Sequence, residues 1–63
     1  MDKNIEKRIH TRTEELHALG RLGRMTYWDR YHECKKLFER APTKEETDEM
    51  LFFGVAILKQ MGT

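Results

Sequence analysis

Long hydrophobic segments, prolines and cysteines are scarce in this sequence. Its longest run without a polar side chain is the nine residues from Met50 to Leu58, whereas a helix needs about 20 apolar residues to cross a bilayer. The single cysteine, Cys34, cannot form an internal disulfide, which is typical of a reducing compartment or of a dimer bridged through that residue. The N-terminus also lacks the charged-then-apolar pattern of a secretion signal. We therefore expect a cytoplasmic protein with no membrane segment.

A strong net charge is missing as well. With 12 Lys and Arg against 11 Asp and Glu, the net charge is +1, whereas many nucleic-acid-binding domains are strongly basic. The charge is unevenly distributed, because residues 1–40 hold ten basic and seven acidic side chains and residues 41–63 hold two and four. This asymmetry indicates either pairing between the two parts of the chain or a basic face that binds a partner.

Motifs of catalytic and metal-binding sites are absent. A structural zinc site usually shows two pairs of ligands, but His32 and Cys34 form one pair, and no third ligand is identified for His10 and His17. The segment 20–23 lacks the preceding strand and the following Lys-Ser/Thr of a nucleotide-binding loop. We therefore expect a non-catalytic protein that holds no metal and no cofactor.

Hydrophobic periodicity predicts three helices, at about residues 3–19, 27–41 and 44–61, in a single all-α domain that spans residues 1–63. The apolar face of the first helix consists of Ile5, Ile9, Leu16 and Leu19. The apolar seam of the second consists of Tyr27, Tyr31, Cys34, Phe38 and Ala41. Capping signals mark the boundaries: Asp2 or Asn4 and then Gly20 for the first helix, Thr26 and Asp29 for the second, and Pro42, Thr43 and Glu46 between the second and third.

Three helices joined by short turns predict a small three-helix bundle, or a helical hairpin with the third helix across it. In an up-down-up bundle, the first and third helices begin at the same end. That placement would bring three cations of the first helix close to three carboxylates of the third, namely Lys3, Lys7 and Arg8 close to Glu45, Glu46 and Glu49.

The third helix is too apolar for the remaining chain to cover. Apolar residues occur on all its sides, and two amphipathic helices cover about two of them. Leaving Phe52 and its neighbours in water would cost several kcal/mol, at roughly 25 cal/mol per Å² of apolar area. We therefore expect self-association or a partner protein to complete the fold. Gly54 fits a close approach of a second backbone, or else it accommodates Trp28 or Tyr31 within the monomer.

A second candidate feature is the corner between the first two helices, where arginines and large aromatic residues gather as they do at protein interfaces. The predicted partner-binding residues of the corner and the third helix are Arg21, Arg24, Tyr27, Trp28, Arg30, Phe52, Gly54 and Ala56. The predicted function is a small helical protein-interaction module, such as an adaptor, an inhibitor or a small regulatory protein. The alternative is a small dimeric nucleic-acid-binding regulator that uses Lys3, Lys7, Arg8, Arg12, Arg21 and Arg24.

Overall fold

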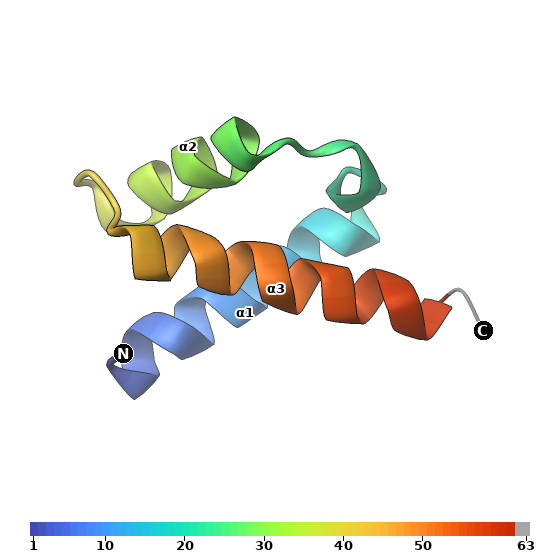
Figure 1. The fold of residues 1–63 in the computed structure, drawn as a ribbon, viewed down its shortest axis with the longest axis horizontal. Coiled ribbons are helices and arrows are strands. Elements are labelled where there is room, and N and C mark those ends of the chain that lie inside the picture. The colour runs from blue at the N-terminus through green and yellow to red at the C-terminus, as the bar shows by residue number, and fades with distance from the viewer. Residues whose placement is uncertain (62–63) are drawn as a thin grey trace.

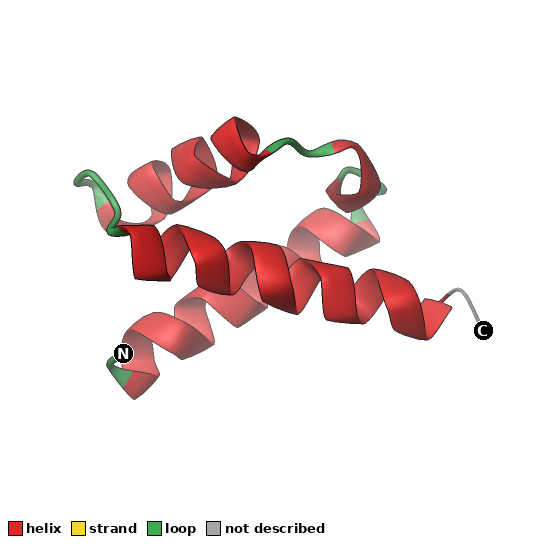
Figure 2. Ribbon diagram, in the orientation of Figure 1, coloured by secondary structure: helices red, strands yellow, loops and turns green. Residues whose placement is uncertain are grey.

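The computed structural model describes the backbone of residues 1–61 and the side chains of residues 1–60. It contains three α-helices, α1 (Lys3–Ala18), α2 (Tyr27–Phe38) and α3 (Lys44–Met61), and a short 3-10 helix, η1 (Leu22–Arg24), between α1 and α2. No strand occurs among the described residues (Figure 2). The prediction of a small all-α bundle is therefore confirmed. No helix within residues 1–61 is long and apolar enough to cross a membrane.

Helix α1 begins and ends with local hydrogen bonds. The Asp2 carboxylate accepts from the backbone amides of Asn4 and Ile5 at 2.7 and 3.4 Å, which satisfies two amides that have no partner inside the helix. At the other end, Gly20 adopts a left-handed φ of 73°, and the Arg21 amide donates to the Leu16 carbonyl at 3.0 Å. The helix ends one residue before the predicted boundary, so Leu19 lies outside it and is exposed.

Helix α2 is shorter than predicted. It starts with a capping box, in which the Asp29 amide donates to the Thr26 hydroxyl at 3.1 Å and the Thr26 amide donates to the Asp29 carboxylate at 2.9 Å. The helix ends at Phe38 because Glu39 adopts a left-handed conformation with a φ of 54°. The chain thus leaves the helix three residues before the predicted end, and Pro42 is not what stops it.

Helix α3 starts with a second capping box, which also holds the preceding turn. The Glu46 amide donates to the Thr43 hydroxyl at 3.1 Å, and the Thr43 amide donates to the Glu46 carboxylate at 2.9 Å. The Arg40 guanidinium reaches both oxygens of the same carboxylate at 2.9 and 2.8 Å. This bidentate contact lowers the pKa of Glu46, and the bonds from Thr43 lower it further.

The helices follow an up-down-up course in which α3 is central. Helix α2 lies alongside α3 and runs antiparallel to it, while α1 crosses behind α3 in the view of Figure 1. The buried core contains Ile9, Leu16, Cys34 and Met50, and partly buried Ile5, Met25, Leu37 and Phe38 pack against it. Every helix therefore contributes to one core, and α3 touches both of the others.

Helices α1 and α3 begin at the same end, but the predicted ion pairs between them do not form. Lys3 and Lys7 are exposed, and Arg8 donates to the Leu37 carbonyl at 2.7 Å instead of pairing with a carboxylate. The carboxylates of α3 are paired by other groups: the Met1 amine lies 3.4 Å from Glu45, His10 lies 2.7 Å from Glu49, and Arg40 lies 2.8 Å from Glu46. The partners differ because Lys3 and Lys7 lie on the solvent side of α1.

Candidate protein-binding site

The side of α3 that faces away from the core is apolar in its middle. We call Phe52, Val55 and Ala56 the outer face. Phe52 is 65% exposed, Val55 is 38% exposed and Ala56 is also exposed. On the opposite side of the same helix, Met50 is fully buried. Single exposed apolar residues are normal, but neighbouring exposed apolar residues form a patch, and apolar patches mark interaction sites.

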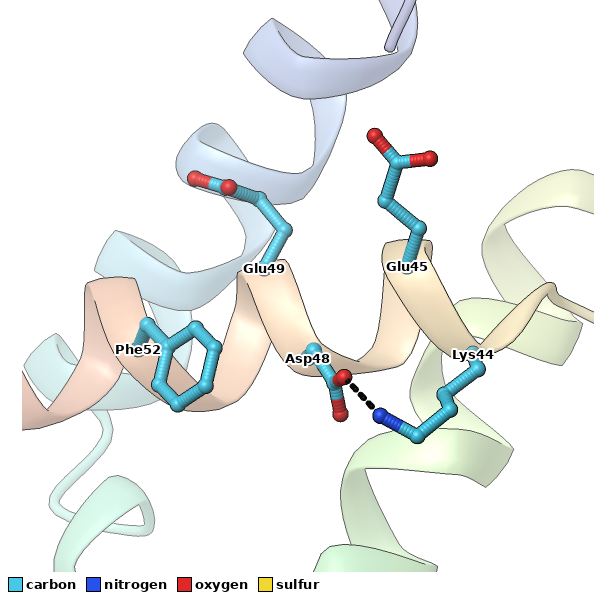
Figure 3. A pocket seen from close by; sticks show the side chains of 5 residues that line it. All are labelled: Lys44, Glu45, Asp48, Glu49 and Phe52. Carbon is cyan, nitrogen blue, oxygen red and sulfur yellow. Dashed lines mark hydrogen bonds and ion pairs between the residues drawn. The ribbon is translucent and has the colours of Figure 1, made fainter.

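Charged side chains flank the outer face at the N-terminal end of α3. Lys44, Glu45, Asp48, Glu49 and Phe52 line a shallow pocket (Figure 3). Glu45 and Glu49 point toward α1, whereas Asp48 lies on the other side of the helix, where the Lys44 amine contacts it at 2.7 Å. The apolar outer face is therefore bordered by charged side chains at this end.

Asp48 also joins the outer face to the start of α2. The Tyr27 hydroxyl donates to the Asp48 carboxylate at 2.9 Å. The Lys44 contact, followed by the Tyr27 hydrogen bond, lowers the pKa of Asp48, and the same hydrogen bond raises the pKa of Tyr27. Asp48 is thus an anion and Tyr27 a neutral donor at neutral pH. Asp48 lies one turn before Phe52 and lines the same pocket, so Tyr27 contacts the charged end of this surface.

Helix α2 also carries an exposed aromatic side chain near its start. Trp28 is 66% exposed. Its ring meets Tyr31 edge to face, with centroids 5.3 Å apart, and lies beside His32, with centroids 6.0 Å apart. These contacts hold the indole in place without covering it. Tyr27 and Trp28, predicted as partner-binding residues, are therefore both accessible.

The three arginines of the predicted corner do not act together. Arg30 is only 5% exposed, and its guanidinium donates to the carbonyls of Met25, Thr26 and Leu22 at 2.6, 3.3 and 3.5 Å. Burial lowers its pKa. Arg30 holds the turn before α2 and is not available to a partner. Arg30 was expected at the surface, but it is buried, because its guanidinium satisfies the carbonyls of that turn.

Arg21 and Arg24 lie at the surface, in a depression that they share with Leu19, Gly20, Met25 and Asp29. Phe52 does not line this depression. The Arg21 guanidinium lies 3.5 Å from Glu33. Arg24 is exposed and makes no ion pair among residues 1–61. Arg21 and Arg24 thus line a different depression from the one that Phe52 lines.

Gly54 faces the inside of the molecule. A Cβ atom at this position would lie 3.2 Å from Leu22 Cδ1, and Leu22 is almost fully buried. The glycine is buried and lets η1 pack closely on α3, so the side chain nearest to it within the chain is Leu22 and not Trp28 or Tyr31. The sequence signal for the true contact was Leu22, the one apolar side chain of segment 20–24.

A cluster of possible metal ligands was missed by the sequence analysis. The donor atoms of Glu6, His10 and Glu49 lie within 4.8 Å of one another. His10 Nε2 lies 2.7 Å from the Glu49 carboxylate, and the His10 ring stacks on Phe53 with centroids 3.9 Å apart. Histidine and carboxylate together suit zinc and other transition metals. The spacing of four between Glu6 and His10 was visible in the sequence, but Glu49 joins them only in the folded chain.

Cys34 lies in the core and not in a reactive site. Its side chain is fully buried, and burial raises the pKa of its thiol to about 11. The sulfur lies 3.9 Å from the Glu46 carbonyl. A protonated, inaccessible thiol is a weak nucleophile. Cys34 therefore acts as a small core residue that links α2 to α3.

Two of the six cations predicted for a nucleic-acid-binding face, Arg12 and Arg21, pair with carboxylates of the described chain. Arg12 lies 3.0 Å from Glu33 and 3.2 Å from Glu15, and these hydrogen bonds, led by the one to Glu33, raise the Arg12 pKa. Arg21 shares the same Glu33. Arg8 lies over the Phe38 ring, 5.1 Å from its centroid. Lys3, Lys7 and Arg24 make no ion pair among the described residues.

No protein-family model, curated protein sequence or solved structure matches this chain significantly.

Proposed function

We propose that this protein is a non-catalytic interaction module that binds another protein chain through the outer face of α3, with Tyr27 and Trp28 at its edge. The observation that carries the proposal is the exposure of Phe52, which is 65% accessible although it lies in the middle of the most apolar helix. Covering a phenylalanine side chain is worth about 2 kcal/mol, and aromatic side chains contribute strongly at protein interfaces.

The surroundings of Phe52 also favour a protein partner. An apolar centre with a charged rim is the usual anatomy of a protein interface. Phe52, Val55 and Ala56 provide the centre, and Lys44 and Asp48 form an ion pair at one end. Trp28 and Tyr27 add two aromatic side chains of the kind that dominate binding energy.

A photoreactive phenylalanine analogue at position 52 tests the proposal in cells of the native host. We expect irradiation to join this position covalently to another protein chain. The matched control carries the analogue in place of Lys36, an exposed residue of α2, and should give no adduct. The proposal fails if position 52 gives no adduct, or if both positions give the same adducts in equal yield.

A further inference from the structure

The outward side of α3 carries a coiled-coil spacing. Asp48, Phe52, Val55 and Lys59 follow one another at intervals of four, three and four residues, which places them along one line of the helix. Phe52, Val55 and Lys59 are exposed and Asp48 is partly exposed. We call these four residues the outer seam. It is separate from the core side of α3, where Met50 and Gly54 are buried.

The charges of the outer seam are arranged symmetrically about its apolar centre. Asp48 lies four residues before Phe52, and Lys59 lies four residues after Val55. A second α3 in the antiparallel direction would therefore place Phe52 against Val55 of the other copy and Asp48 against its Lys59. A parallel second helix would place like charges opposite each other, which is destabilising. The seam is thus complementary to itself in one direction only.

The side chains beside the outer seam fit such a pairing. Ala56 is small and exposed next to Val55, which lets a second helix approach closely. Lys59 makes no ion pair within residues 1–61, so its ammonium is available to a carboxylate of the other copy. A two-fold axis would repeat each contact, as is usual in homodimers.

We propose that the partner of the outer face is a second copy of this chain, and that the two α3 helices pair antiparallel through the outer seam. This proposal rests on the proposed function, because it names the protein that the outer face binds. The two-fold axis lies between residues 53 and 54 of each copy.

Sedimentation equilibrium of the purified chain, with reductant present, tests the self-association. We expect a species of twice the chain mass at concentrations of about 100 μM. A strict monomer up to about 1 mM overturns the second-copy proposal. The proposed function then survives only if the crosslink at position 52 gives an adduct with a different protein, so the two failures are distinguishable.

Charge reversal tests the direction and register of the pairing. Asp48→Lys sets two lysines against each other in the dimer, and Lys59→Asp sets two aspartates against each other. We expect each variant alone to dimerise at least roughly tenfold more weakly than the wild type. An equal mixture of the two variants restores both opposite-charge pairs, so it should form a heterodimer as tightly as the wild type.

Two further measurements separate this effect from damage to the monomer. Lys36→Asp reverses an exposed charge of α2 that lies outside the outer seam, and it should leave the dimer intact. Circular dichroism of Asp48→Lys and Lys59→Asp should show wild-type helicity. If both variants fold and their mixture stays monomeric, the antiparallel pairing is overturned.

Discussion

Two residues of α3 that are only two positions apart have opposite environments. Met50 is fully buried, whereas Phe52 is 65% exposed. An ionised side chain is tolerated in water and is costly in a core that offers it no partner. The two positions therefore provide a matched pair for separating the core of this helix from its binding surface.

We expect Phe52→Glu to change the free energy of unfolding of the monomer by less than about 1 kcal/mol and to abolish binding through the outer face. Met50→Glu should prevent folding, because it buries a charge among Ile9, Leu16 and Cys34. Far-UV circular dichroism with urea titration measures both effects. Unfolding of the Phe52→Glu monomer would show that Phe52 belongs to the core.

The thiol of Cys34 reports on opening of the core. Because Cys34 is fully buried and its pKa is raised to about 11, we expect alkylation of the native protein at about pH 8 to be limited by unfolding. The measurement is the alkylation rate at increasing urea, followed by mass spectrometry. A rate in the native protein equal to that of a free thiol would contradict this burial.

At the scale of the element, Glu46 couples the start of α3 to pH. Its pKa is lowered mainly by Arg40 and also by Thr43. The unfolded chain therefore binds a proton at higher pH than the folded chain does. The stabilisation is present above the usual carboxyl pKa near 4.5 and is lost as the pH falls through the lower folded value.

We expect Glu46→Gln to lower the stability at neutral pH by about 1 kcal/mol, the usual cost of a lost helix cap. The variant should also lose less stability than the wild type between about pH 5 and pH 3. Urea unfolding across this range measures the difference. Glu14→Gln, which changes an exposed carboxylate of α1, should follow the wild-type profile, and equal slopes for wild type and Glu46→Gln would contradict the assignment.

The turn before α2 depends on the guanidinium of Arg30. Its guanidinium donates to three backbone carbonyls, and a lysine amine cannot reach all three in the same planar geometry. We expect Arg30→Lys to lower the free energy of unfolding by about 2 kcal/mol. Arg24→Lys, on the exposed side of η1, should be neutral. Equal stabilities of the two variants would show that the three bonds contribute little.

At the scale of the whole molecule, self-association would make stability depend on concentration. Binding that occurs only in the folded state raises Tm with protein concentration. We expect the Tm of the wild type to rise over a hundredfold range of concentration and that of Phe52→Glu to stay constant. Differential scanning calorimetry measures both. A constant wild-type Tm would contradict a dimer that forms in that range.

The sequence by itself determined that three helices form and which residues cap the second and third of them. Periodic apolar residues placed three helices, and Thr26 with Asp29 and Thr43 with Glu46 formed the predicted capping boxes, because capping is a contact between residues three apart. The outer face could also be expected from the sequence, since apolar residues on every side of one helix exceed what two short helices cover. Phe52 and Ala56 are exposed as that argument requires.

The tertiary structure alone decided which residues meet across the chain. The end of α2 at Phe38 depends on the left-handed Glu39 and on the turn that Arg40 and Glu46 hold. Arg30 was predicted at the surface and Gly54 at a partner, but Arg30 binds the carbonyls of the turn and Gly54 packs on Leu22. Gly54 and Leu22 are far apart in the sequence, and Arg30 contacts carbonyls of a turn outside its own helix. Helical periodicity does not predict contacts of either kind.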